Sequence, residues 1–367
     1  MTQHVIQAGL AMGMSATEGI HKLDPNLAKP ALTTIGSLTP QNFIPSPSSR
    51  ILLRGKKGDI QAPIMNIGAW SWGDTATFDW KPEQFEELKQ AWPILQSSGV
   101  NWIDTAPIYG DGESERLCGR LVVGLPRDSF IMQTKWSVLP TPEPVFPKDS
   151  PLVMLKESLE RMRLDYVDVY LVHGPIHPQS FSVVAKGLAE CVDQDLTKTI
   201  GVANYNKEEM IELANELDKY GIPIALNQCE FSLLRRYPET HGLIQACQER
   251  GIIFQSYSSL GVGRLTGKYT TENPPPRTYR FAAYDMKDIE PVQEALQHIG
   301  RARGKSMAAV ALNYNICKGA VPTVGLRSAQ QAESNVEALG WRLTEDEVMT
   351  LDRVSLEGKA TILWQHG

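Results

Sequence analysis

The strongest constraint on the fold is a repeated alternation of short apolar runs with longer amphipathic stretches. The first such stretch places Phe85, Leu88, Trp92 and Leu95 on one helical face, and the pattern then repeats along the chain. Strands that alternate with helices predict a parallel sheet covered by helices. We predict strands at 64–69, 100–103, 129–134, 167–171, 198–202, 224–228, 252–256 and 319–322.

Eight strand–helix units favour a closed (β/α)8 TIM barrel of the α/β class, whose active site lies at the carboxyl ends of the strands. No Gly-x-Gly-x-x-Gly motif follows the first predicted strand, which weakens the alternative of a doubly wound dinucleotide-binding sheet. Thr344 and the acidic residues after it predict the start of a last helix. The other predicted helices are 82–95, 113–123, 150–163, 182–194, 206–219, 240–250, 288–303, 306–317 and 328–338.

Two segments precede the barrel. The runs 50–54 and 60–64 flank a Gly-bearing turn and predict a β-hairpin, which we expect to cover the bottom of the barrel. Residues 1–49 are rich in Ser, Thr, Pro and Ala and contain no arginine. We expect a poorly structured extension there, followed by the barrel domain at 50–367. Organellar targeting is the weaker alternative, because transit peptides carry arginines.

Composition and charge restrict the partners. A hydrophobic content of 42% with a net charge of -6 and no dense Lys/Arg block argues against nucleic acid. The apolar runs are too short to span a bilayer, so we expect a cytoplasmic protein without a membrane partner, whose oligomeric state is open. No metal site or disulfide is expected, because no metal-ligand spacing occurs among Cys118, Cys191, Cys229, Cys247 and Cys317.

Four chemically active side chains follow successive predicted strands. Asp104 ends the second strand, Tyr109 lies five positions later in a Gly-bearing loop, Lys135 ends the third strand and His173 follows the fourth. A nearby ammonium makes a phenol a better proton donor, and a carboxylate can hold that ammonium in place. An imidazole can orient a carbonyl oxygen. Each residue alone has a structural explanation, but together they predict a general acid beside a hydride acceptor.

These residues belong to motifs that resemble the aldo-keto reductase superfamily. The resemblance covers about residues 50–355 and is closest to the branch with plant, fungal and bacterial reductases and potassium-channel β subunits. It implies an NADP(H)-dependent barrel reductase with Asp104, Tyr109, Lys135 and His173 as its catalytic tetrad. The motifs are Asp-Thr-Ala-x-x-Tyr-Gly-x-Gly-x-Ser-Glu at 104–115, Thr-Lys at 134–135, Leu-Val-His at 171–173, and the segments 201–205, 227–228, 257–261, 265–269 and 327–335.

The resemblance also implies that the dinucleotide lies extended across the barrel mouth. Asn204 and Gln228 can each hydrogen-bond the nicotinamide carboxamide, and Tyr257 is placed to stack on its ring. Arg327, at the start of a helix, suits a 2′-phosphate. The implied cofactor-binding residues are Gly68, Ala69, Trp70, Asp104, Ala203, Asn204, Gln228, Tyr257, Ser258, Ser259, Leu260, Gly261, Lys268, Gly325, Arg327, Gln331 and Asn335.

Two positions depart from the family pattern. Relatives often have Ser where this chain has Ala203, so one hydroxyl contact to the cofactor is expected to be missing. The branch often has an acid where this chain has Ser334, which puts the adenine contacts in question.

Aromatic residues suggest the substrate side. Trp70, Trp72 and Trp136 follow the first and third strands and could form, with Tyr109 and His173, an apolar pocket; core packing is the alternative for each tryptophan. The segment 269–285 is too long for a plain connector and is a candidate cover for cofactor or substrate.

The expected reaction is NADPH-dependent reduction of an aldehyde or ketone to an alcohol. A cofactor-binding regulatory or scaffolding subunit of the channel-β type is the alternative. Reduction of an activated C=C bond is a third reading, which His173 disfavours. The sequence leaves open the substrate, the direction of the reaction and a strict preference for NADPH over NADH.

Overall fold

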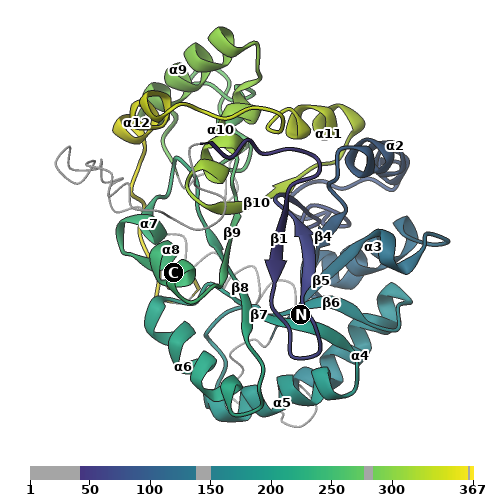
Figure 1. The fold of residues 1–367 in the computed structure, drawn as a ribbon. Coiled ribbons are helices and arrows are strands. Elements are labelled where there is room, and N and C mark those ends of the chain that lie inside the picture. Colours follow the sequence, from purple (N-terminus) through teal and green to yellow (C-terminus); the bar gives the residue numbers. More distant parts are fainter. Residues whose placement is uncertain (1–41, 138–149, 277–283, 363) are drawn as a thin grey trace.

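The computed structural model describes residues 42–137, 150–276, 284–362 and 364–367. Eight parallel strands close into a barrel in the order β10-β3-β4-β5-β6-β7-β8-β9, which confirms the predicted (β/α)8 fold (Figure 1). The strands are β3 (Asn66–Gly68), β4 (Trp102–Asp104), β5 (Ile131–Trp136), β6 (Val167–Val172), β7 (Thr197–Ala203), β8 (Ile224–Glu230), β9 (Ile253–Tyr257) and β10 (Ala320–Gly325).

Helices surround the barrel and bury its outer face. Each described strand residue of β5 and β6 is buried, because the strands are covered on both sides. The helices are α2 (Gln84–Ser97), α3 (Glu113–Leu121), α4 (Pro151–Met162), α5 (Phe181–Asp193), α6 (Lys207–Asp218), α7 (Tyr237–Thr240), α8 (Leu243–Glu249), α9 (Met286–Arg303), α10 (Met307–Cys317), α11 (Ala329–Val336) and α12 (Glu345–Val354).

The element boundaries agree with the sequence to within a few residues, with one correction. The helix expected at 240–250 begins later, as α8, because Gly242 before it has a left-handed φ of 76°, and the short helix α7 that precedes Gly242 was not expected. The predicted start of the last helix is confirmed: Thr344 caps α12, and Glu347 completes a capping box. Among the helices of the described chain, none is long and apolar enough to cross a membrane.

A hairpin of β1 (Arg50–Leu53) and β2 (Ile60–Pro63) closes the bottom of the barrel, as expected. Its turn carries Lys56 and Lys57, which form ion pairs of 2.7 and 2.6 Å with Asp193 and Asp195, just before β7 begins. Leu53 and Ala62 are fully buried in the core. The hairpin therefore lies at the amino ends of the strands, opposite the end at which Asp104 lies.

Residues 42–49 pack on the barrel ahead of this hairpin. The Pro45 carbonyl accepts a 2.7 Å hydrogen bond from the amide of Gly340, and Arg342 donates to the Phe43 carbonyl at 3.3 Å. A Cβ on Gly99 would lie 1.9 Å from the Pro47 carbonyl oxygen, so this close approach requires glycine. The expectation for residues 1–41 lies outside the described residues.

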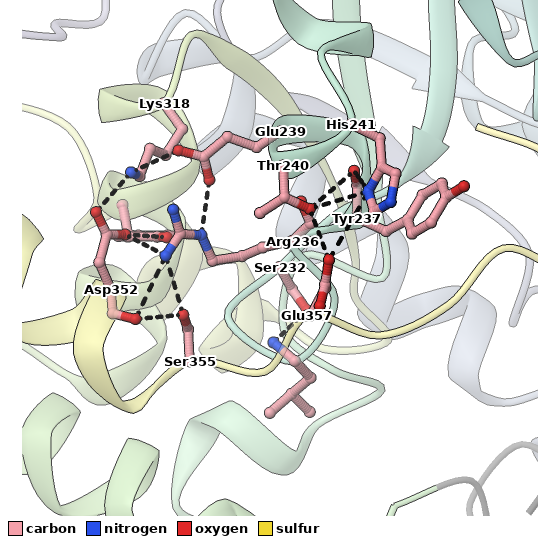
Figure 2. Close-up of polar contacts among 12 residues, drawn as sticks. Ser232, Arg236, Tyr237, Glu239, Thr240, His241, Lys318, Asp352, Ser355 and Glu357 are labelled. Atoms are coloured by element: carbon pink, nitrogen blue, oxygen red, sulfur yellow. Dashed lines mark hydrogen bonds and ion pairs between the residues drawn. The ribbon is translucent and has the colours of Figure 1, made fainter. Parts of the chain in front are cut away.

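A largely buried ring of four charges, of which only Glu239 is partly exposed, ties the C-terminal helix to the barrel (Figure 2). Arg236 pairs with Glu239 at 2.7 Å and with Asp352 at 3.1 Å, and Lys318 pairs with the same two carboxylates at 2.8 Å each. Burial alone would raise the pKa of Glu239, but the neighbouring charges of Lys318 and Arg236 outweigh burial and lower it. The ring joins α7, the end of α10 and α12, so each of its charges depends on the other three.

Candidate active site

The four predicted catalytic side chains meet at the carboxyl ends of β4, β5 and β6. The Lys135 ammonium lies 2.6 Å from Oδ1 of Asp104 and 3.3 Å from the Tyr109 hydroxyl. The rings of Tyr109 and His173 are 5.7 Å apart and nearly perpendicular. Three strands and the loop after β4 therefore bring an acid, an amine, a phenol and an imidazole into one constellation.

The Lys135 ammonium is fully buried and faces three acceptors, the third being the Thr105 carbonyl at 2.8 Å. Burial alone would lower the pKa of Lys135, but attraction to the Asp104 carboxylate and the contacts with Tyr109 outweigh burial and raise it. The amine is therefore charged at neutral pH. A positive charge at this distance stabilises negative charge that develops on the Tyr109 oxygen.

The His173 imidazole is neutral at neutral pH. Burial, with the Lys135 charge as a second cause, lowers its pKa well below the ordinary value. Nδ1 lies 2.6 Å from the Ser137 hydroxyl. When Ser137 donates this hydrogen bond, the ring proton is on Nε2, which can then donate to an oxygen in front of it. Ser137 was missed from the sequence, although its place two residues after Lys135 at a strand end was a usable signal.

A strained turn holds Tyr109 over the barrel. The 3-10 turn η1 (Tyr109–Gly112) contains Gly110 and Asp111, each with a φ of 57°. A Cβ on Gly110 would lie 2.8 Å from the backbone of Gly73, so the turn packs directly against the loop after β3. The motif glycines therefore set the position of the phenol.

A cavity of about 390 Å³ runs from the tetrad across the barrel mouth to α11. Its size suits a small-molecule site. Among the described residues, Ala69, Ala203 and Gly261 lie off its wall, and Lys135 lies buried behind Tyr109. The predicted residues on the wall are Gly68, Trp70, Asp104, Tyr109, His173, Asn204, Gln228, Tyr257, Ser258, Ser259, Leu260, Lys268, Gly325, Arg327, Gln331 and Asn335.

Two of the three tryptophans expected to form a substrate pocket lie in the core instead. Trp72 is buried and donates from Nε1 to the Leu326 carbonyl at 2.8 Å. Trp136 is buried with its ring 5.5 Å from that of His177. Of the three, only Trp70 is on the cavity wall. A residue at a strand end can line the barrel mouth or pack in the core, and burial of a large ring favoured the core for Trp72 and Trp136.

Backbone strain occurs on the cavity wall. Asn204, Ser258 and Val262 line it and have left-handed φ values of 66°, 53° and 53°. Non-glycine residues adopt this conformation at a cost, which is typical of functional sites. The Asn204 side chain is itself fixed, because it donates to the His173 carbonyl at 3.0 Å and accepts from the Tyr257 hydroxyl at 2.8 Å.

The far end of the cavity lies at the start of α11. Arg327 donates to the Phe78 carbonyl at 2.8 Å, and the side-chain oxygen of Gln331 accepts from the Arg327 amide at 2.7 Å. Asn335 is buried on the wall, and its Nδ2 has no hydrogen-bond partner among the described residues. An unpartnered buried donor beside an arginine fits a polar, anionic ligand. Ser334, the departure from the family pattern, lies on the same wall.

The C-terminal segment also borders the cavity, which the sequence did not reveal. The Trp364 ring lines the wall 5.0 Å from the ring of His173. Gln365 donates to the Tyr257 hydroxyl at 3.3 Å, and His366 is 2.7 Å from Glu209, which raises the pKa of that histidine. This segment follows the last helix and has no periodicity, so its only signal was a tryptophan in a short polar stretch.

Comparison with known proteins assigns the family. Residues 65–356 match the aldo/keto reductase family, and the chain belongs to this family of oxidoreductases that act on small carbonyl compounds. The resemblance inferred from the motifs is thereby confirmed.

Two curated relatives and one solved structure illustrate the match. Pyridoxal reductase, chloroplastic, of Arabidopsis thaliana is 32% identical over 322 residues, which cover 84% of this chain and 87% of the relative. L-glyceraldehyde 3-phosphate reductase of Escherichia coli (strain K12) is 28% identical over 332 residues, covering 85% and 93%. An aldo-keto reductase from Klebsiella pneumoniae, solved in complex with NADPH, has the same fold with a TM-score of 0.65, 23% identity and coverage of 84% and 95%.

Proposed function

We propose that this oxidoreductase reduces an aldehyde or ketone to an alcohol with a nicotinamide cofactor, and that Tyr109 is its general acid. The observation that carries the proposal is the buried Lys135 ammonium, held by Asp104 and only 3.3 Å from a phenol that faces the cavity. That charge favours proton release from Tyr109 to an alkoxide that forms in front of it. The neutral His173 donates a hydrogen bond that orients the carbonyl oxygen toward Tyr109.

NADP(H) is the proposed cofactor, and it supplies the hydride. Asn204 and Gln228 would hold the carboxamide, and Tyr257 would cover the nicotinamide ring. Arg327, Gln331 and Asn335 would bind the 2′-phosphate and the adenosine, a role supported by the unpartnered Nδ2 of Asn335 on the cavity wall. Ala203 contributes no hydroxyl, so the carboxamide would depend on the two amide side chains.

Planar aromatic aldehydes are the proposed substrate class. The space in front of His173 is bordered by the rings of Trp70, Tyr109 and Trp364, which favour a flat, partly apolar substrate. Pyridoxal is a natural first test compound, because the Arabidopsis relative is named for that aldehyde.

The test is a carbonyl screen that follows oxidation of NADPH and of NADH by absorbance, with aromatic and short aliphatic aldehydes side by side. We expect turnover that requires Tyr109, and faster turnover with NADPH than with NADH. Tight NADPH binding without turnover of any carbonyl would instead support the regulatory subunit reading. Faster reduction of short aliphatic aldehydes would refute the proposed substrate class.

A further inference from the structure

Two glutamines that the proposed mechanism does not use lie in the barrel interior next to the tetrad. Gln133 of β5 and Gln255 of β9 are both fully buried. The interior of such a barrel is usually filled by branched apolar side chains. Gln133 is the neighbour of Asp104 in strand register, and Gln255 is the neighbour of Gln228.

These side chains form a closed ring of hydrogen bonds with Asp104 and Gln228. Nε2 of Gln133 donates to Oδ1 of Asp104 at 2.7 Å and to Oε1 of Gln255 at 3.0 Å. Nε2 of Gln228 donates to Oδ2 of Asp104 at 3.1 Å and to the same Oε1 of Gln255 at 2.6 Å. Since β4 and β8, like β5 and β9, are four strands apart in the barrel order, the ring spans the interior from wall to wall.

The hydrogen-bonding chemistry determines the direction of every bond in the ring. A carboxylate can only accept, so Gln133 and Gln228 must turn their nitrogens toward Asp104. Each nitrogen has one remaining hydrogen, and only the oxygen of Gln255 can accept both. Consequently Gln228, which lines the cavity, has only its amide oxygen left to offer a ligand.

Stability does not explain the two glutamines. Oε1 of Gln133 and Nε2 of Gln255 are buried and have no hydrogen-bond partner among the described residues. Such groups are costly to bury, and a pair of apolar side chains would avoid that cost. Polar groups kept at a cost beside catalytic residues point to a functional role.

We propose that Gln133 and Gln255 are positioning residues for the catalytic carboxylate and for Gln228. Gln255 accepts from the side-chain amides of Gln133 and Gln228 and holds both in place. Asp104 therefore receives hydrogen bonds from these two amides and from Lys135, and it cannot rotate away from the ammonium. The inference rests on the proposed function, because it assigns the ring to the same reduction.

The test uses near-isosteric substitutions, Gln133→Met and Gln255→Met, and the double variant. Loss of a hydrogen bond to the Asp104 carboxylate predicts a roughly tenfold lower kcat for Gln133→Met. Gln255→Met should approach the same loss, because it removes the acceptor that holds both Gln133 and Gln228. We expect KM to change little. Because either substitution opens the ring, the double variant should lose little more activity than either single one. Gln248→Met, the same change on α8 outside the ring, is the matched control and should retain wild-type kcat.

A pH profile separates positioning from packing. Lys135 contacts the Tyr109 hydroxyl, Asp104 pairs with Lys135, and the His173 ring lies against the Tyr109 ring. In Gln133→Met the Asp104 charge is shared with fewer donors, so it counteracts the Lys135 charge more strongly and the pKa of the phenol rises. We expect the alkaline limb of kcat/KM for reduction to move upward by as much as about one pH unit.

Two kinetic results would overturn the inference. One is an unchanged kcat and pH profile in variants that only melt earlier; the other is a double variant whose losses multiply.

Hydrogen exchange of the glutamine side-chain amides, measured by NMR, is independent of turnover. Slow exchange for Gln133 and Gln228 in the wild type, and faster exchange for Gln228 in Gln255→Met, are expected. If the wild type reduced no carbonyl, the proposed function would fail, whereas fast exchange in the wild type would refute the ring itself.

Discussion

Replacing Tyr109 by Phe should remove the chemistry while leaving the site intact. The substitution deletes one oxygen and keeps the ring against Trp70 and His173. The Lys135 ammonium loses its longest contact, at 3.3 Å, and keeps those to Asp104 at 2.6 Å and to the Thr105 carbonyl at 2.8 Å. The buried charge therefore remains paired, and we expect a melting temperature close to that of the wild type.

The size of the effect follows from the role of the hydroxyl. A positioned general acid accelerates a reaction by about 10²–10⁴-fold, so kcat should fall by ~10²-fold or more, which corresponds to at least about 2.7 kcal/mol. NADPH affinity should be nearly unchanged, because the groups at the other end of the cavity are untouched. Fluorescence titration of NADPH and steady-state turnover of an aromatic aldehyde measure the two quantities on the same sample.

A contrasting variant strengthens the interpretation. Lys135→Met should also abolish turnover, but it leaves the buried Asp104 carboxylate without its cation and should destabilise the fold by roughly 3–5 kcal/mol. Wild-type turnover in Tyr109→Phe on a good substrate would show that the phenol is not the proton donor and would refute the tetrad.

Three further predictions concern the cofactor, the charge ring and the N-terminal segment. Arg327→Ala should weaken NADPH binding roughly tenfold more than NADH binding, since a charge-assisted contact is worth about 1.5–3 kcal/mol; equal losses in titrations would place Arg327 away from the 2′-phosphate. Lys318→Met should destabilise the protein by about 3–5 kcal/mol in urea unfolding at neutral pH. The Glu239 carboxylate, whose pKa is lowered in the folded protein, stabilises the fold fully only above its pKa in the unfolded chain. The stability difference between the wild type and Lys318→Met should therefore shrink as the pH falls through the pKa of Glu239 in the folded protein. A constant difference would contradict the pairing of Lys318 with Glu239. A chain that starts at Asn42 should keep wild-type kcat/KM and melting temperature, whereas one that starts at Arg50 loses the contacts of Phe43 and Pro45 and should melt earlier.

The barrel and the tetrad could be predicted because both follow from one-dimensional patterns. A strand buried on both faces is a short apolar run, and its carboxyl end is the next position along the chain. Once the barrel was inferred, Asp104, Lys135 and His173 were necessarily close together, since their strands are neighbours. Helix starts marked by capping residues, such as Thr344, could be predicted in the same way.

Features that depend on side-chain direction could not be predicted in this way. Trp72 and Trp136 occupy the same kind of strand-end position as Trp70, yet they point into the core. Trp364 reaches the cavity from a segment without periodicity, and its neighbour His173 is far away in sequence. The hydrogen bond between Gln133 and Gln255 joins strands on opposite walls, and such a pair leaves no trace in a local pattern.

The buried charge ring on α7, α10 and α12 has a consequence for how this sequence can diverge. Every cation there touches both carboxylates, so any single replacement leaves the ring with one uncompensated charge. The four positions are therefore strongly epistatic: a change at one is tolerated only after a compensating change at another. Among descendants of this chain, Arg236, Glu239, Lys318 and Asp352 should be inherited as a block or replaced as a block, and partial sets should be rare.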